Sequence, residues 1–161
     1  MKRSVIPLFV ALVVGVLLSA SPAASAPGIV HKVTVGSPDS VLFPPGGDAN
    51  FSLVAIERDD GTVTGQWQDT FSGRGVPAFP IHVEISCLVV EGNDAWVSGL
   101  VTHPDFLAGL PAITQVRDNG TSANDPPDQV SFTFQALSVD ECLDQPDLPL
   151  FDLNNGEVKV R

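Results

Sequence analysis

The sequence has few basic residues. Its 161 residues include 8 Lys and Arg against 19 Asp and Glu, which gives a formal net charge of −11 at pH 7. Apart from Lys2 and Arg3 at the N-terminus, the remaining six basic residues do not cluster, so they offer no cradle for a phosphate or a similar anion. A surface this acidic also repels nucleic-acid backbones and anionic lipids. The composition therefore disfavours nucleic acid as a partner and leaves cations and basic proteins open.

Only one long apolar run is present, and it lies at the N-terminus. VIPLFVALVVGVLLSA follows Lys2 and Arg3 and precedes the small residues SPAASA. This order is typical of a secretory signal peptide. The run is shorter than the roughly 20 residues that a membrane helix needs, and no later segment is as apolar. We expect a signal peptide over residues 1–26, a secreted or extracytoplasmic location, and no membrane span in the remaining chain.

The rest of the chain, residues 27–161, is expected to form a single domain. No internal repeat is visible, and loss of Lys2 and Arg3 lowers the net charge from −11 to −13. Cysteine occurs only twice, as Cys87 and Cys142. In an exported chain an even cysteine count predicts a disulfide, which would tie the tail after Ser138 to the middle of the domain.

Helical periodicity is absent beyond the N-terminal run. Short runs rich in β-branched and aromatic residues recur between clusters of Gly, Pro, Asn and Asp. The expected strands are 29–35, 49–57, 62–71, 80–90, 94–103, 112–118, 129–137 and 156–161. The sequence therefore predicts an all-β domain, an antiparallel eight-stranded barrel or sandwich after an N-terminal signal peptide. The choice between the two depends on whether 29–35 pairs with 156–161.

Two hairpins can be registered from their turns. A three-residue loop ending at Gly61 makes Arg58 face Thr62. This places Phe51, Leu53 and Ala55 on one face with Val63, Gly65 and Trp67. The Gly92-Asn93 turn pairs Val90 with Ala95. The expected inner face there carries Ile81, Val83, Ile85, Cys87, Val89, Trp96, Ser98, Leu100 and Thr102, and the outer face carries His82, Glu84, Ser86, Val101 and His103.

A third pattern lies near the end of the chain. Val130, Phe132, Phe134 and Ala136 alternate with polar residues, which predicts one strand that is buried on one side.

Four segments together resemble a group of small secreted bacterial β domains. They are GTVTGQWQDTF, CLVVEGNDAWVSGLVT, QVRDNGTSANDPPDQVSFTF and the closing GEVKVR, and they extend over residues 51–161. More loosely, the D-N-G loop and the last strand are similar to post-COAP-type domains, from which Pro126-Pro127 and the longer loop depart. The resemblance implies export and an all-β domain, and it assigns no catalytic residue.

The loop DNGTSANDPPDQVSF is rich in oxygen donors. Asp118, Asn119, Asp125 and Asp128 could supply the hard oxygen ligands that Ca²⁺ prefers. Their spacing is not that of an EF-hand, and Asp and Asn also form turns by bonding to their local backbone. We therefore keep two interpretations, a calcium site and a self-bonded turn between two strands.

The deduced register predicts a second metal site. It places His82 opposite His103 with Glu84 on the same face, and two imidazoles with one carboxylate are a typical catalytic zinc set. Ser86 shares that face, so a Ser/His/Glu hydrolase can be drawn, but no G-x-S-x-G turn accompanies it. The alternative is a polar row that faces solvent.

The residues favour an exported non-catalytic β domain, a binding or structural module for an extracellular protein or carbohydrate. Trp67 and Trp96 could stack on a sugar, but both fall on expected inner faces, which favours packing in the core. A carrier that holds a small apolar ligand in a barrel cavity is the second hypothesis. A metal-dependent hydrolase built on His82, Glu84 and His103 is the third.

Overall fold

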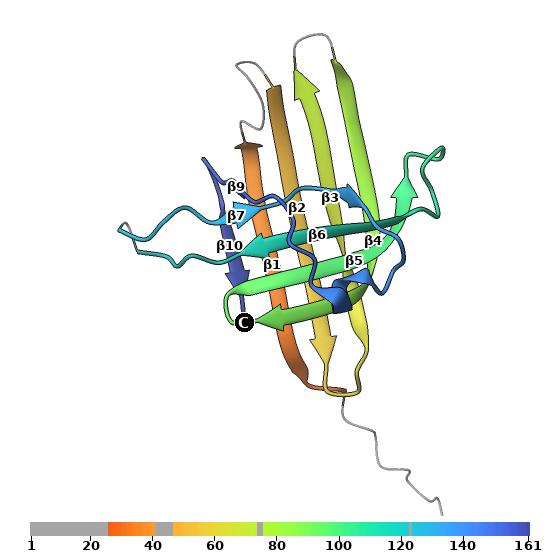
Figure 1. Ribbon diagram of the computed structural model, residues 1–161, viewed down its shortest axis with the longest axis vertical. Coiled ribbons are helices and arrows are strands. Elements are labelled where there is room, and N and C mark those ends of the chain that lie inside the picture. The colour runs from red at the N-terminus through yellow and green to blue at the C-terminus, as the bar shows by residue number, and fades with distance from the viewer. Residues whose placement is uncertain (1–25, 41–46, 74–75, 123) are drawn as a thin grey trace, which may run out of the picture.

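The computed structural model describes residues 26–40, 47–73, 76–122 and 124–161, which form one antiparallel β-sheet (Figure 1). The predicted signal peptide lies, apart from Ala26, outside the described residues. The strand order is β10-β1-β2-β3-β4-β5-β6-β7-β9, and β8 pairs with β6 beside this path. The elements are β1 (Ile29–Ser40), β2 (Gly47–Arg58), β3 (Val63–Gly73), β4 (Val76–Glu91), β5 (Asp94–His103), β6 (Pro111–Arg117), β7 (Gln129–Val130), β8 (Phe134–Gln135), the 3₁₀ helix η1 (Glu141–Asp144), β9 (Phe151–Asp152) and β10 (Glu157–Val160).

The sheet curls into a half-barrel, in which β5, β6 and β7 cross in front of β1, β2 and β3 (Figure 1). The all-β prediction is confirmed. The first and last strands pair, with Val33 opposite Val160 and Val35 opposite Val158, so β10 extends the sheet beyond β1 and forms one of its edges. The core lies inside the curl and is built from both layers: Phe51, Leu53 and Trp67 on β2 and β3, and Val97, Val116 and Val130 on β5 to β7. No helix among the described residues is long and apolar enough to cross a membrane.

The hairpin between β2 and β3 has the predicted register. The backbone N–H of Arg58 donates to the carbonyl oxygen of Thr62 at 3.0 Å, and Leu53 pairs with Trp67. Gly61 has a φ of 79°, a left-handed conformation that glycine adopts without steric cost. Turn chemistry was therefore sufficient to place this part of the core.

The predicted strand 129–137 is broken in the middle. Phe132 has a φ of 60°, so β7 ends at Val130 and β8 begins at Phe134. Val130, Phe132 and Ala136 are buried as expected, but Phe134 is 37% exposed, and its predicted burial is wrong. This break and the added strand β9 raise the number of strands from the predicted eight to ten.

Two register shifts alter the faces of β4 and β5. Val90 pairs with Ala95 as predicted, but an irregularity between Ile85 and Cys87 inserts an extra residue into β4. The inward side chains are therefore Val83, Ile85 and then Leu88, with Val97 and Val101 opposite. The predicted inner face with Trp96, Ser98, Leu100 and Thr102 is wrong, as is the outward position of Val101. A second shift next to His82 restores the predicted pairing of His82 with His103.

The tail after β8 covers the outside of β5. The predicted disulfide between Cys87 and Cys142 is confirmed, and the two cysteines bury Trp96 in a small cluster of their own. The Trp96 indole Nε1–H donates to the carbonyl oxygen of Pro146 at 2.9 Å, and the Ser98 hydroxyl donates to that of Val139. The tail is thus held by one covalent bond and two hydrogen bonds to β4 and β5.

Candidate functional site

Two aspartates of the predicted calcium loop bind the last strand of the sheet. Asp128 Oδ2 accepts a hydrogen bond from the backbone N–H of Val158 at 2.6 Å, and Asp118 Oδ2 accepts one from that of Val160 at 3.1 Å. Their other oxygens accept from the backbone of the loop itself, Asn119 at 2.7 Å and Gly120 at 3.0 Å. Asp118 and Asp128 are referred to below as the clasp aspartates.

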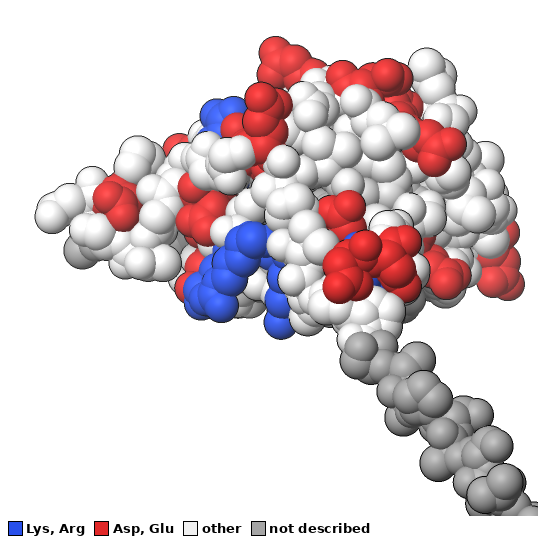
Figure 2. Space-filling model, turned by 90° about the horizontal axis from the view of Figure 1, so that it is seen from below, with Lys and Arg blue, Asp and Glu red and all other residues white. Residues whose placement is uncertain are grey.

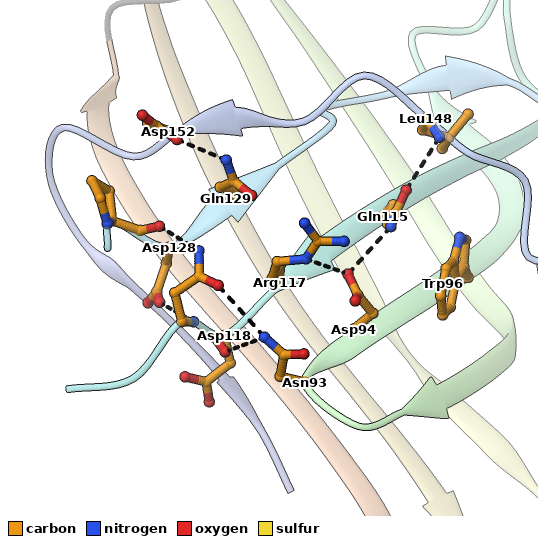
Figure 3. Close-up of polar contacts among 12 residues, drawn as sticks. Asn93, Asp94, Trp96, Gln115, Arg117, Asp118, Asp128, Gln129, Leu148 and Asp152 are labelled. Atoms are coloured by element: carbon orange, nitrogen blue, oxygen red, sulfur yellow. Dashed lines mark hydrogen bonds and ion pairs between the residues drawn. The ribbon is translucent and has the colours of Figure 1, made fainter. Parts of the chain in front are cut away.

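The rest of the loop is anchored to its neighbours. The Asn93 side-chain amide donates to the carbonyl oxygen of Asp118 at 2.9 Å, and the two residues face one another in Figure 3. The Asn119 side-chain amide donates to the carbonyl oxygen of Pro127 at 2.6 Å, and the N–H of Leu153 donates to that of Asp128 at 2.7 Å. The Asn and Asp side chains therefore act as turn formers and as links between segments.

This geometry bears on the calcium hypothesis. Asp125, the remaining predicted carboxylate ligand, is exposed and accepts a hydrogen bond from the Ser122 N–H at 2.8 Å. Across the described ranges, no group of three or more His, Cys, Asp or Glu residues is placed to hold a metal ion. A calcium site at Asp118, Asn119, Asp125 and Asp128 stays a prediction, while the self-bonded turn accounts for the contacts that are present.

A second polar cluster lies in the core and joins two residues of β3 to Thr133. Asp69 is fully buried, and its Oδ2 accepts hydrogen bonds from both the N–H and the hydroxyl of Thr133, at 3.0 and 2.8 Å. The indole Nε1–H of Trp67 donates to the same Thr133 hydroxyl oxygen at 3.0 Å. Thr133 follows Phe132, so these bonds hold the chain where the left-handed residue breaks the strand.

The environment of Asp69 favours its neutral form. Burial raises the pKa of this carboxyl from its ordinary value of 3.8 to about 7, although the two hydrogen bonds from Thr133 act in the opposite direction. Asp69 Oδ1 is buried and has no hydrogen-bond partner among the described residues. An ionised carboxylate with one unpaired oxygen is costly in such a site, so a proton on Asp69 stabilises the fold.

Another set of polar contacts, around Asp94, lies beside the clasp aspartates (Figure 3). Arg117 Nε donates to Asp94 Oδ1 at 2.8 Å, and the Gln115 amide donates to the same oxygen at 3.3 Å. The Gln115 side-chain oxygen in turn accepts from the backbone N–H of Leu148 at 3.2 Å. These bonds fix the tail against β6.

A surface hollow with a volume of about 610 Å³ lies on the solvent side of β2 to β5. Its polar lining consists of Ser52, Gln66, Gln68, His82, Glu84 and Thr102. These residues alternate with core residues such as Leu53, Trp67 and Val83, so they point away from the core. Gly65 also lines the hollow, and a β-carbon there would collide with the carbonyl oxygen of Val54. The hollow is referred to below as the outer groove.

The outer groove contains part of the predicted zinc set. His82 pairs with His103, and their ring centroids are 5.2 Å apart. Glu84 lines the same groove but pairs with Leu100 and does not form a metal-binding group of three with the two histidines. Ser86 is exposed and lies at the irregularity in β4, where it has no paired residue on β5.

The two tryptophans are buried, and aromatic rings pack inside the half-barrel. Trp67 is 1% exposed and packs in the core as predicted. Trp96 is 8% exposed, but it is buried against the Cys87–Cys142 disulfide and not on the predicted inner face, and neither ring presents a face to a sugar. Phe132 packs edge-on against Phe51, with 5.9 Å between ring centroids, and its ring is tilted against that of Phe151 at 5.8 Å. Aromatic rings therefore occupy the middle of the half-barrel, where the carrier hypothesis placed a ligand.

The motifs that suggested a family are explained by these contacts. Asn93, Trp96 and Ser98 of the G-N-x-A-W-V-S-G hairpin each bond to another segment, and the aspartates of the D-N-G and PPD segments bond to the terminal strand. No family model, curated protein or solved structure matches the chain. The resemblance to small secreted bacterial β domains stays a prediction, and its motif residues serve the fold.

Proposed function

We propose that the protein is an exported, non-catalytic binding module that recognises a basic polypeptide segment in the outer groove. The observation that carries this proposal is the groove itself, a hollow of about 610 Å³ on the solvent face of the sheet with polar and apolar lining residues. The clasp aspartates, Trp96 and Ser98 are already bonded to the fold, whereas Gln66 and Glu84 make no side-chain hydrogen bond in the described structure.

Charge favours a basic partner. Glu84 lies in the groove, no Lys or Arg is among its lining residues, and the whole chain has a formal net charge of −11. In the face drawn in Figure 2, Asp and Glu appear at many separate places, whereas Lys and Arg appear at few. Such a field accelerates the approach of a cationic partner and slows that of an anionic one.

The lining favours a polypeptide over a sugar. Sugar sites commonly use an exposed aromatic ring, and both tryptophans are buried. Glutamine side chains can donate to and accept from peptide groups at once, and a glutamate pairs with Lys or Arg. Val54 is 43% exposed beside them and adds an apolar contact.

The test is an NMR titration of the oxidised, ¹⁵N-labelled chain with a lysine-rich peptide at two salt concentrations. We expect shift changes at Gln66, Gln68 and Glu84, and weaker binding at the higher salt. A Gln66→Ala, Glu84→Gln double variant should bind at least about tenfold more weakly, which corresponds to about 1.4 kcal/mol.

The matched control is Gln135→Ala, an exposed glutamine on β8 outside the groove, which should bind like the wild type. An acidic peptide of equal length and a neutral oligosaccharide serve as control ligands. Equal binding of the acidic peptide, or shift changes confined to residues outside the groove, would show that the proposal is wrong.

A further inference from the structure

His82 and His103 form a pair of imidazoles on neighbouring strands. They occupy directly opposed positions on β4 and β5, and their rings are tilted by 43° with centroids 5.2 Å apart. His82 is half-buried and lines the outer groove, and His103 is exposed. His103 keeps this pairing although it directly precedes Pro104.

The separation of the rings fits two ligands of one metal ion. Zinc binds imidazole nitrogen at about 2.0–2.1 Å and prefers a tetrahedral arrangement. Two imidazoles bound to one tetrahedral ion have ring centres roughly 5 Å apart by this geometry. The observed separation of 5.2 Å matches this value.

The surroundings favour a cation. Glu84 lines the same groove, and no Lys or Arg is among the lining residues. Both histidines are on strands whose pairing fixes the backbone, and the Thr102 hydroxyl donates to the carbonyl oxygen of His82 at 3.3 Å. Two ligands that are already held close together lose less conformational entropy when a metal joins them.

We propose that His82 and His103 chelate one divalent transition metal ion of the zinc type, and that water or a side chain of a partner completes the coordination. Imidazole suits Zn²⁺, Cu²⁺ and Ni²⁺ better than Ca²⁺ or Mg²⁺, so the site is selective by ligand type. The inference goes beyond the proposed function, because recognition of a basic peptide in the groove does not require the metal.

The first experiment is calorimetric titration of the oxidised, untagged chain with ZnCl₂. We expect one site, and we expect His82→Ala and His103→Ala each to weaken zinc binding at least about tenfold. His31 is the third histidine of the sequence and lies on β1, where its Nδ1 contacts Glu57 Oε2 at 2.7 Å. His31→Ala is therefore the matched control and should bind zinc like the wild type.

Melting curves in EDTA show whether the variants fold. If either variant does not, zinc-induced shifts of the three histidine side chains in the wild type decide the matter, and the proposal requires shifts at His82 and His103 with none at His31. No binding of zinc by the wild type at millimolar concentration, or binding by a folded His82→Ala or His103→Ala variant that is as tight as that of the wild type, would overturn the proposal. The lysine-rich peptide titration repeated in EDTA separates the two ideas, since a failure of the metal site leaves peptide binding unchanged.

Discussion

Asp128 and Val158 are 30 residues apart in the sequence, and the carboxylate of the first accepts a hydrogen bond from the backbone N–H of the second at 2.6 Å. Val158 is on β10, which is one edge of the sheet, and Asp128 directly precedes β7 near the other edge. Together with Asp118, it links the two ends of the curl through side chains, because no strand ladder is described between β10 and β7.

Asp128→Ala should lower the free energy of unfolding by about 2–4 kcal/mol, because it leaves the N–H groups of Asn119 and Val158 without their acceptor. Asp125→Ala is the control, because that exposed carboxylate accepts only the N–H of Ser122 among the described contacts, and it should cost less than about 1 kcal/mol. Urea denaturation followed by fluorescence measures both. Equal losses in the two variants would contradict the role assigned to the clasp aspartates.

Asp69 should make the stability depend on pH. The folded-state pKa of about 7 lies above the ordinary 3.8, so the folded chain holds a proton that the unfolded chain releases in this range. The contribution is fully present below pH 3.8 and is lost as the pH rises toward 7, and it amounts to about 4 kcal/mol. Asp69→Asn should remove it, so the difference in unfolding free energy between wild type and variant should change across pH 4–7. A difference that stays constant with pH would be incompatible with a protonated Asp69.

Phe132 offers a test of the strand break. Its buried ring contacts Phe51, Phe71 and Phe151, so Phe132→Ala should destabilise the fold by about 3–5 kcal/mol. Phe132→Gly loses the same ring but suits the φ of 60°, so it should be at least as stable as the alanine variant. At an ordinary strand position the glycine variant would instead be less stable than the alanine variant. Thermal unfolding of the pair decides it, and a markedly less stable glycine variant would argue against the left-handed conformation.

The disulfide should be detectable by thiol titration and by stability. Unfolded, unreduced protein should show no free thiol, since Cys87 and Cys142 are bonded. Their sequence separation of 55 predicts a loss of about 4 kcal/mol on replacement of both by alanine, from the entropy of the unfolded chain. Two reactive thiols per unreduced chain would rule out the bond.

The turn residues in the sequence predicted the register of the hairpins that these turns connect. The turn at Gly61 gave the β2–β3 register, and the pairing of Val90 with Ala95 followed from the Gly92-Asn93 turn. The extra residue near Ser86 exchanged the predicted faces of β5, because an alternating pattern does not show where a bulge lies.

The remaining differences arise from contacts that are distant in the sequence. The strand over 129–137 breaks where Thr133 bonds to Asp69, a partner 64 residues away. The loop that contains the clasp aspartates has the composition of an ordinary turn. The spacing of its residues in the sequence does not reveal that two of them bond to β10. The outer groove was missed because Gln66 and Gln68 have the pattern of any solvent-facing row. The pairing of His82 with His103 was predicted from the Gly92-Asn93 turn and is confirmed, because the two register shifts between β4 and β5 cancel.

The clasp aspartates have a further effect on how separate molecules meet. An edge strand normally presents a row of free N–H groups, which invites a strand of another chain and begins aggregation. On β10 the outward N–H groups of Val158 and Val160 are already bonded to carboxylates. Asp128 and Val158 are also buried, so this stretch of the β10 edge has no free N–H group to offer to a strand of another chain.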